Sequence, residues 1–115
     1  MKPDTGQDLT RLLRWEAALD GLIEAANHCD SHEGPSVRLD RQAVLNVLRR
    51  CVSGELDAFE LPRWAGAVHM LDRVELDEAD ADPLTQFLFE VSSPELFDSI
   101  TTDVCQRWID RLELA

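Results

Sequence analysis

Apolar side chains recur at spacings of three and four residues in several separate stretches, and this pattern restricts the possible folds more than any other feature. Such spacing places the side chains on one side of an α-helix, whereas a half-buried strand requires alternating apolar and polar residues. No segment alternates over enough length to indicate a strand. The sequence therefore predicts an all-α fold, a compact single-domain bundle of about five to six short helices formed by residues 7–115, after a flexible N-terminus at 1–6.

Residues that stop helices divide the chain into segments. The first helix is predicted over residues 7–28, where the apolar stripe is continuous. A connection at 29–36 follows, because Gly34 and Pro35 cannot continue a helix. The first third of the chain is thus expected to be one long helix and a loop.

Helix-capping residues place the next two helices. The second predicted helix begins after Asp40, which suits an N-cap, and ends at Gly54, where a left-handed residue is favoured. Asp57 and Glu60 have the spacing of a capping box, so a third helix is expected there. Pro62 removes one hydrogen bond inside that helix, which predicts a kink or a helix that restarts at this point.

The remaining third of the chain contains an acidic connection and further helix starts. The stretch 75–82 is predicted to be a short acidic connection. Asp82 followed by Pro83 indicates the N-cap and first residue of a fourth helix. Ser93, again followed by proline, predicts a single turn, and Thr101 is expected to cap the last helix.

The charge of the chain argues for one class of partner and against another. With 23 acidic and 11 basic side chains, the formal net charge is −12. Nucleic acid is not an expected partner, because phosphate neutralisation requires clustered Lys and Arg. The negative electrostatic field of such a chain attracts basic surfaces over roughly one Debye length, ~8 Å at physiological salt. We therefore expect a basic protein partner, with solubility alone as the alternative role of the charge.

The sequence also indicates a compartment. No apolar run approaches the ~20 residues of a membrane-spanning helix, so no membrane association is expected. The start of the sequence lacks the apolar stretch of a secretory signal. Cys29, Cys51 and Cys105 are an odd number and form no C-x-x-C pair, which is typical of a reduced intracellular protein. We expect a cytoplasmic monomer or homodimer, and the excess of Arg over Lys favours a bacterial source.

An acidic ridge is predicted on the first helix. Glu16, Asp20, Glu24 and His28 follow one another at four-residue intervals, so they would share one side of a continuous helix. Like charges at this spacing repel by roughly 0.2–0.5 kcal/mol per pair, so the ridge lowers the stability of the helix. A function that needs these side chains together would explain why they are present. A divalent metal site is one interpretation, and a solvated face neutralised by nearby arginines is the other.

A second possible metal region adjoins this ridge. Glu24, His28, Cys29 and His32 place several potential ligands close together in the sequence. A zinc site usually contains a second spaced pair of ligands, and Cys51, His69 and Cys105 are isolated singles. A metal-binding helical protein or enzyme that uses this region is therefore retained as an alternative, while no metal ligand is assigned.

Known catalytic motifs are missing from the sequence. It contains no glycine-rich phosphate loop, no Gly-x-Ser-x-Gly and no His-Glu-x-x-His. The acidic run at 77–82 lacks the glycine and the final glutamate of a calcium-binding loop. We therefore predict a protein that is not an enzyme and has neither catalytic residues nor a cofactor.

Two interaction surfaces are predicted in place of an active site. A structural homodimer is one possibility, because Phe87, Phe89 and Phe97 exceed what one side of a short helical region can bury. A docking surface for a basic protein is the leading hypothesis, with Trp15 as a partly exposed anchor at the edge of its apolar stripe. The predicted partner-binding residues are Glu16, Asp20, Glu24, Glu75, Asp77, Glu78, Asp80, Asp82 and Trp15.

Residues 44–112 resemble small, mostly uncharacterised bacterial helical proteins. The resemblance is carried by the segments LRRCVSGELD at 48–57, LPRWA at 61–65 and SPELF at 93–97. In size, acidity and helical content the chain is also similar to immunity proteins, which neutralise basic toxin nucleases. The resemblance implies an immunity-type binding protein and no catalytic residue, and residues 1–43 lie outside it.

Overall fold

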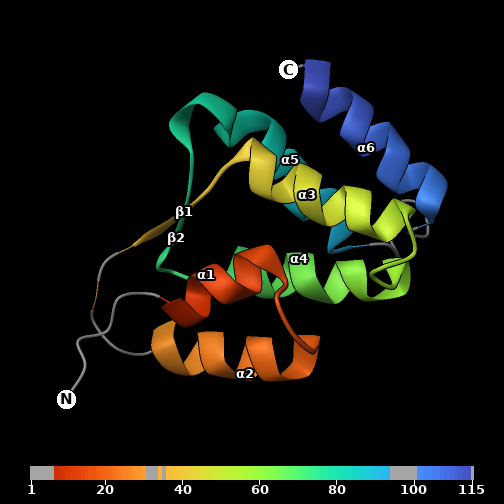
Figure 1. The fold of residues 1–115 in the computed structure, drawn as a ribbon. Helices are drawn as coiled ribbons and strands as arrows, with labels where there is room; N and C mark the ends of the chain where they lie inside the picture. Colours follow the sequence, from red (N-terminus) through yellow and green to blue (C-terminus); the bar gives the residue numbers. More distant parts are fainter. Residues whose placement is uncertain (1–6, 31–33, 35, 94–100, 115) are drawn as a thin grey trace.

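Six α-helices, two 3₁₀ turns and a two-stranded sheet make up the part of the chain that the computed structural model describes, residues 7–30, 34, 36–93 and 101–114 (Figure 1). The predicted all-α fold is confirmed, because each strand is only three residues long. In chain order the elements are α1 (Gln7–Arg14), α2 (Leu19–Asp30), β1 (Val37–Leu39), α3 (Arg41–Val52), η1 (Ala58–Glu60), α4 (Leu61–Met70), β2 (Val74–Leu76), η2 (Glu78–Asp80), α5 (Ala81–Val91) and α6 (Thr102–Leu114).

Several predicted helix ends are confirmed by their hydrogen bonds. The Asp40 side chain accepts from the main-chain N–H of Ala43 at 2.9 Å and caps α3. After α3, Gly54 has a φ of 86°, a left-handed conformation that glycine adopts without a steric penalty. The Thr101 hydroxyl accepts from the N–H of Val104 at 3.3 Å and caps α6. These ends depend on residues within a few positions of one another.

The third predicted helix restarts at its proline. Asp57 caps the 3₁₀ turn η1 by accepting from the N–H of Phe59 at 2.9 Å. The α-helix α4 then begins at Leu61, with Pro62 in its first turn. A proline at this place costs no helical hydrogen bond, because the first N–H groups of a helix lack partners within the helix. Of the two predicted outcomes, the structure contains the restart.

Two of the predicted boundaries were wrong. The stretch 75–82 is not a plain connection, since it contains most of β2 and all of η2. Helix α5 begins at Ala81 with Asp80 as N-cap, so Asp82 and Pro83 lie within its first turn. The 3₁₀ turn η2 ends at Asp80, directly before Ala81, so the helix starts at this turn and not at the proline. The turn predicted at Ser93 and beyond lies in residues 94–100, outside the described part of the chain.

The predicted long helix at 7–28 was also wrong, because the chain breaks after Arg14. Trp15 has a φ of 52°, which is rare for a non-glycine residue and ends the helix. Its indole is buried and stacks on that of Trp64, with ring centroids 6.1 Å apart and an interplanar angle of 13°. The Arg50 guanidinium donates to the carbonyl oxygens of Arg14 and Trp15 at 2.8 and 3.2 Å. Tertiary contacts thus replace the hydrogen bonds that a continuous helix would have made.

The sheet is the element that sequence periodicity missed. Strands β1 and β2 pair in parallel, with Val37 opposite Val74 and Leu39 opposite Leu76. Three residues are too few to establish an alternating pattern, so neither strand is recognisable from the sequence. Leu39 is fully buried, whereas Val37 and Val74 are half-buried against the core. The pairing connects the loop before α3 to the loop after α4.

The helices pack as three pairs around one core. The most extensive contacts are those of α3 with α6, α1 with α2, and α4 with α5, and α1 lies between α2 and α3 in the view of Figure 1.

Within the described residues, no helix has both the length and the apolar character needed to cross a membrane. The largest fully buried side chains are Trp64, Phe87, Leu9, Leu12, Leu39, Leu45, Leu48, Leu61, Leu84, Leu112, Val44 and Val47.

Candidate functional site

Carboxylates gather where the two parallel strands end. Because Leu39 pairs with Leu76, the residues that follow them, Asp40 and Asp77, lie side by side. The N–H of Asp77 donates to the carbonyl oxygen of Leu39 at 2.8 Å, which extends the pairing to this point. The carboxyl ends of parallel strands are a common place for binding residues, because the strands direct their following loops to one edge.

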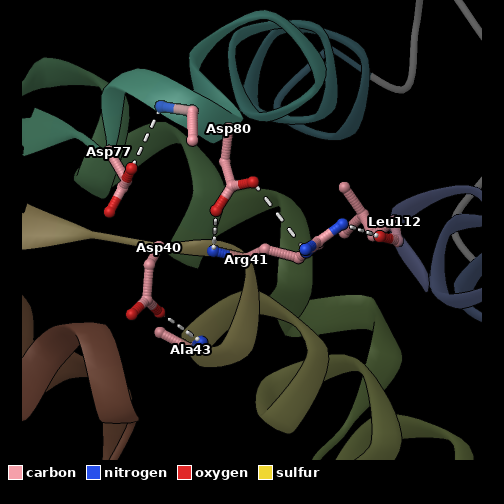
Figure 2. A network of polar contacts seen from close by, with 7 residues as sticks. Asp40, Arg41, Ala43, Asp77, Asp80 and Leu112 are labelled. Atoms are coloured by element: carbon pink, nitrogen blue, oxygen red, sulfur yellow. Dashed lines mark hydrogen bonds and ion pairs between the residues drawn. The ribbon is translucent and has the colours of Figure 1, made fainter. Parts of the chain in front are cut away.

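Each aspartate at this edge is fixed by a local hydrogen bond (Figure 2). The Asp40 carboxylate accepts from the N–H of Ala43, and the Asp77 carboxylate accepts from the N–H of Ala79 at 3.0 Å. Both carboxylates therefore cap a turn or helix N-terminus, where the helix dipole favours negative charge. Their positions are set by rigid backbone rather than by flexible loops.

Arg41 connects this edge to the far end of α6. Its main-chain N–H donates to the Asp80 carboxylate at 3.1 Å, and its guanidinium Nε lies 3.8 Å from the same carboxylate. The guanidinium Nη1 also donates to the carbonyl oxygen of Leu112 at 3.0 Å (Figure 2). A helix C-terminus carries partial negative charge, so the positive charge of Arg41 interacts favourably both with the Asp80 carboxylate and with the end of α6.

A groove of about 700 Å³ extends the acidic edge towards α1. Two carboxylates, Glu16 and Asp40, line it together with two guanidinium groups, Arg14 and Arg50. Glu16 is exposed in the break between α1 and α2, so this break brings it to the groove. We call Glu16, Asp40, Asp77, Glu78 and Asp82 the acidic surface; Asp77 is half-buried and the other four are exposed.

The predicted ridge on the first helix is divided by the same break. Asp20, Glu24 and His28 stay at four-residue intervals on α2, whereas Glu16 lies outside that helix. The Asp20 carboxylate accepts a hydrogen bond from the guanidinium of Arg63 on α4, which raises the pKa of Arg63. Figure 1 places α2 at the opposite side of the molecule from the start of α5. The predicted partner-binding residues therefore occupy at least two separate surfaces.

Two other predicted binding residues differ in their surroundings. Glu75 is exposed on β2, at the register position beside Arg38. The expectation that Trp15 is a partly exposed anchor was wrong, because its relative exposure is 3%. The left-handed backbone of Trp15 turns the indole into the core, against Trp64. Trp15 thus fixes the break that positions Glu16 and does not itself reach a partner.

The proposed metal region does not converge on one point in the described residues. Glu24 and His28 are exposed, but Cys29 is buried and its Sγ accepts from Arg73 Nη1 at 3.4 Å. His32 lies outside the described part of the chain. Among residues 7–30, 34, 36–93 and 101–114, no three His, Cys, Asp or Glu side chains are arranged to hold a metal ion.

The aromatic cluster proposed for a homodimer is also divided. Phe87 is fully buried and meets Trp108 edge-on, with ring centroids 5.2 Å apart. Phe89 is 50% exposed on the same helix. Phe97 lies outside the described residues. Phe87 therefore belongs to the core, and Phe89 is the member of the set that the structure places at the surface.

Asp40 and Arg41 belong to the site but were missed as site residues in the sequence. Asp40 was recognised as a helix cap, and nothing local indicated that it meets Asp77 from the second strand. A search for two short apolar segments, each followed by an aspartate at a helix start, would have found the pair. Comparison with other proteins adds nothing to this site, since no protein family, curated protein or solved structure matches the chain.

Proposed function

We propose that this chain is a non-enzymatic binding protein whose acidic surface docks a basic protein. The observation that carries the proposal is the placement of acidic residues from three separate parts of the sequence: Glu16 and Asp40 line the groove, Asp77 follows the strand paired with the one before Asp40, and Glu78 and Asp82 follow in η2 and the first turn of α5. A surface assembled on helix starts and strand ends is rigid, so little ordering is needed when a partner binds.

The use of the arginines supports this proposal. Arg41, Arg50 and Arg73 each donate to main-chain carbonyl oxygens at the C-terminal end of a different helix, α6, α1 and α2 respectively. Their charge therefore offsets helix dipoles and fixes the fold. A large share of the carboxylates that give the chain its net charge of −12 lies exposed at the surface.

Charges of this kind act mainly on the rate of association. A negative surface attracts a cationic partner over about one Debye length, ~8 Å, and raises the association rate constant at low salt. Exposed charges at the rim of an interface contribute more to this rate than to the lifetime of the complex. Binding that depends on the acidic surface should therefore weaken as salt is added.

The finer proposal is an immunity-type protein that neutralises a basic toxin in a bacterial cytoplasm. Its support is the resemblance in size, acidity and helical content described above. An immunity gene lies beside the gene of its toxin, so the product of the neighbouring gene is the partner to test. Co-expression and purification of the two proteins, followed by titration calorimetry, measures the affinity directly.

A pair of double variants tests whether the acidic surface makes the contact. Glu78→Lys with Asp82→Lys reverses two exposed charges of the surface, each in the first turn of a helix. Asp103→Lys with Asp110→Lys makes the same change in net charge at two exposed positions of α6, neither of which belongs to the acidic surface. We expect the first pair to lower the association rate constant about tenfold at low salt and the second to change it far less.

Three results would contradict the proposal. The neighbouring gene product does not bind, or it binds with an affinity that salt leaves unchanged, or both double variants weaken binding equally. The last result would mean that net charge alone acts and that the acidic surface is not the contact. Thermal unfolding of each variant controls for loss of fold.

A further inference from the structure

The groove beside α3 follows one side of that helix. Gln42, Asn46 and Arg50 succeed one another at four-residue intervals in α3, and all three line the groove. From its N-cap, Asp40, to Arg50 the helix rises by about 15 Å, at about 1.5 Å per residue. A groove of about 700 Å³ with this length has room for a short peptide segment.

Hydrogen bonds join the two walls of the groove at one end. Arg50 Nη1 donates to the carbonyl oxygens of Arg14 and Trp15 at 2.8 and 3.2 Å, which connects α3 to the break after α1. Glu16 directly follows Trp15, so it lines the groove at this end. Asp40 lines the groove at the start of α3. Each end of the groove therefore has one carboxylate.

The two side-chain amides between these ends have the spacing of an extended main chain. Gln42 and Asn46 are four residues apart in α3, which corresponds to a rise of about 6 Å. In an extended peptide, main-chain groups that face one side recur every second residue, about 6.6 Å apart. Each side-chain amide contains both donors and an acceptor, as a peptide group does. Both side chains are exposed, and neither is hydrogen-bonded to another residue of the described chain. They are thus placed to contact successive peptide groups of one extended segment.

The charges of the groove favour a basic occupant. Arg50 forms an ion pair with Glu55 in addition to its two carbonyl contacts, so its charge is compensated within the protein. Glu16 and Asp40 then outnumber Arg14, the other cation of the lining, by one charge. The net charge of −12 on the chain as a whole adds to this local excess.

We propose that this groove binds an extended segment of the basic partner, in which two basic side chains four positions apart reach Asp40 and Glu16. Side chains at the first and fifth positions of an extended segment point to the same side and lie about 13 Å apart. This separation is close to the rise of about 15 Å between the two ends of the groove. The inference rests on the proposed function, because Glu16 and Asp40 belong to the acidic surface. It adds the form of the partner segment and the two amides that bind its main chain.

A short capped peptide and the full chain are sufficient for the first test. The probe is acetyl-Arg-Thr-Val-Thr-Arg-amide, whose β-branched residues favour an extended chain and whose charges occupy the first and fifth positions. Binding is followed at low salt by NMR of the ¹⁵N-labelled protein, and we expect saturable shifts in the side-chain amide signals of Gln42 and Asn46. The peptide acetyl-Thr-Arg-Arg-Val-Thr-amide has the same composition but adjacent arginines, which reach only one of the two carboxylates. It should bind about fivefold more weakly.

A double variant tests the amides without changing the net charge. Gln42→Ala with Asn46→Ala should weaken binding of the first peptide about tenfold, because two hydrogen bonds to its main chain are lost. The matched control is Asn27→Ala with Gln86→Ala, which removes the same two kinds of amide from exposed positions of α2 and α5. The control should bind the peptide as the wild-type protein does. The NMR spectrum of each variant also shows whether it is folded.

Single variants test the charges of the groove. Glu16→Gln removes one of the two carboxylates and should weaken binding of the first peptide about fivefold. Arg14→Gln removes a cation from the lining and should strengthen binding, because the peptide is cationic. Asp103→Asn on α6 makes the same change in net charge as Glu16→Gln, at an exposed position outside the groove. It should have little effect.

Several results would overturn the inference. The shifts spread over the surface without saturating, or both arginine spacings bind equally, or the Gln42 and Asn46 double variant binds the first peptide as the wild-type protein does. Each of these results means that the negative field alone attracts the peptide. Arginine amide that binds as tightly as the peptide also overturns the inference, because the groove then takes a single cation.

The product of the neighbouring gene separates this inference from the proposed function. If that protein binds in a salt-dependent manner and the Gln42 and Asn46 double variant leaves the lifetime of the complex unchanged, the acidic surface is retained and the peptide groove is overturned. If that protein does not bind while the first peptide binds with the expected spacing preference, the proposed function is wrong and the groove is retained as a site for extended basic peptides.

Discussion

The indole Nε1 of Trp64 donates a hydrogen bond of 2.7 Å to the main-chain carbonyl oxygen of Leu12, 52 residues earlier in the sequence. The same carbonyl oxygen accepts from the N–H of Trp15 at 3.0 Å. Trp64 therefore fixes the end of α1 by a hydrogen bond and supports the ring of Trp15 by stacking. This contact positions the break in which Glu16 turns towards the groove.

Replacing Trp64 with phenylalanine should cost more than the loss of volume alone. The indole is fully buried, and phenylalanine has no N–H group to replace its Nε1. Trp64→Phe therefore removes the hydrogen bond from this side chain to the carbonyl oxygen of Leu12 in the core. We expect a loss of about 2–3 kcal/mol in the free energy of unfolding, measured by urea denaturation. Trp108→Phe, which truncates another buried indole, should cost about half as much. Equal losses would show that the hydrogen bond to Leu12 contributes nothing measurable.

The two glycines with open space around them should respond in opposite directions. A methyl group at Gly21 or Gly54 meets no atom within 4 Å, so any effect comes from the backbone. Gly21 is in helix α2, and Gly21→Ala should stabilise the protein by about 0.5–1 kcal/mol. Gly54 has a φ of 86°, so Gly54→Ala should destabilise it by about 1 kcal/mol. Thermal unfolding of both variants checks the signs, and the same sign for both would contradict the backbone argument.

Gly34 and Arg73 should be energetically coupled. A methyl group at Gly34 would press on the guanidinium of Arg73, 2.8 Å from its Cζ, and that group is held by the carbonyl oxygen of Cys29. Gly34→Ala should therefore cost about 1–3 kcal/mol in the wild-type protein. In an Arg73→Ala background the same substitution should cost much less, because the obstructing group is gone. A double-mutant cycle by urea denaturation measures the difference, and strict additivity would refute the contact.

Asp80 and Asp82 are two carboxylates on the same segment with different structural roles. The Asp80 side chain is 16% exposed and binds both the main chain and the guanidinium of Arg41. Asp80→Asn should lower the free energy of unfolding by about 1–2 kcal/mol, since a charge-assisted contact is lost. Asp82 is exposed, and Asp82→Asn should change stability by less than about 0.5 kcal/mol. Guanidinium chloride would mask part of this effect, so urea is the denaturant to use.

The candidate site was only partly accessible to sequence reasoning. The carboxylates of 75–82 were identified as a group, and most of them do lie at one edge of the molecule. Their neighbour Asp40 was missed, and Asp20 and Glu24 were assigned to the same ridge as Glu16 although a break separates them. Grouping by helical spacing fails wherever a helix ends early, because every later side chain then points in a new direction.

What the sequence determined by itself is where helices start and stop when the cause is local. Asp40, Gly54 and Thr101 act on hydrogen bonds or dihedral angles within a few residues, and such effects are the same in almost any fold. The tertiary structure decided the break at Trp15 and the pairing of β1 with β2. Both require a partner far along the chain, Trp64 in one case and the opposite strand in the other. The free energy of such contacts comes from burial and pairing that no local pattern records.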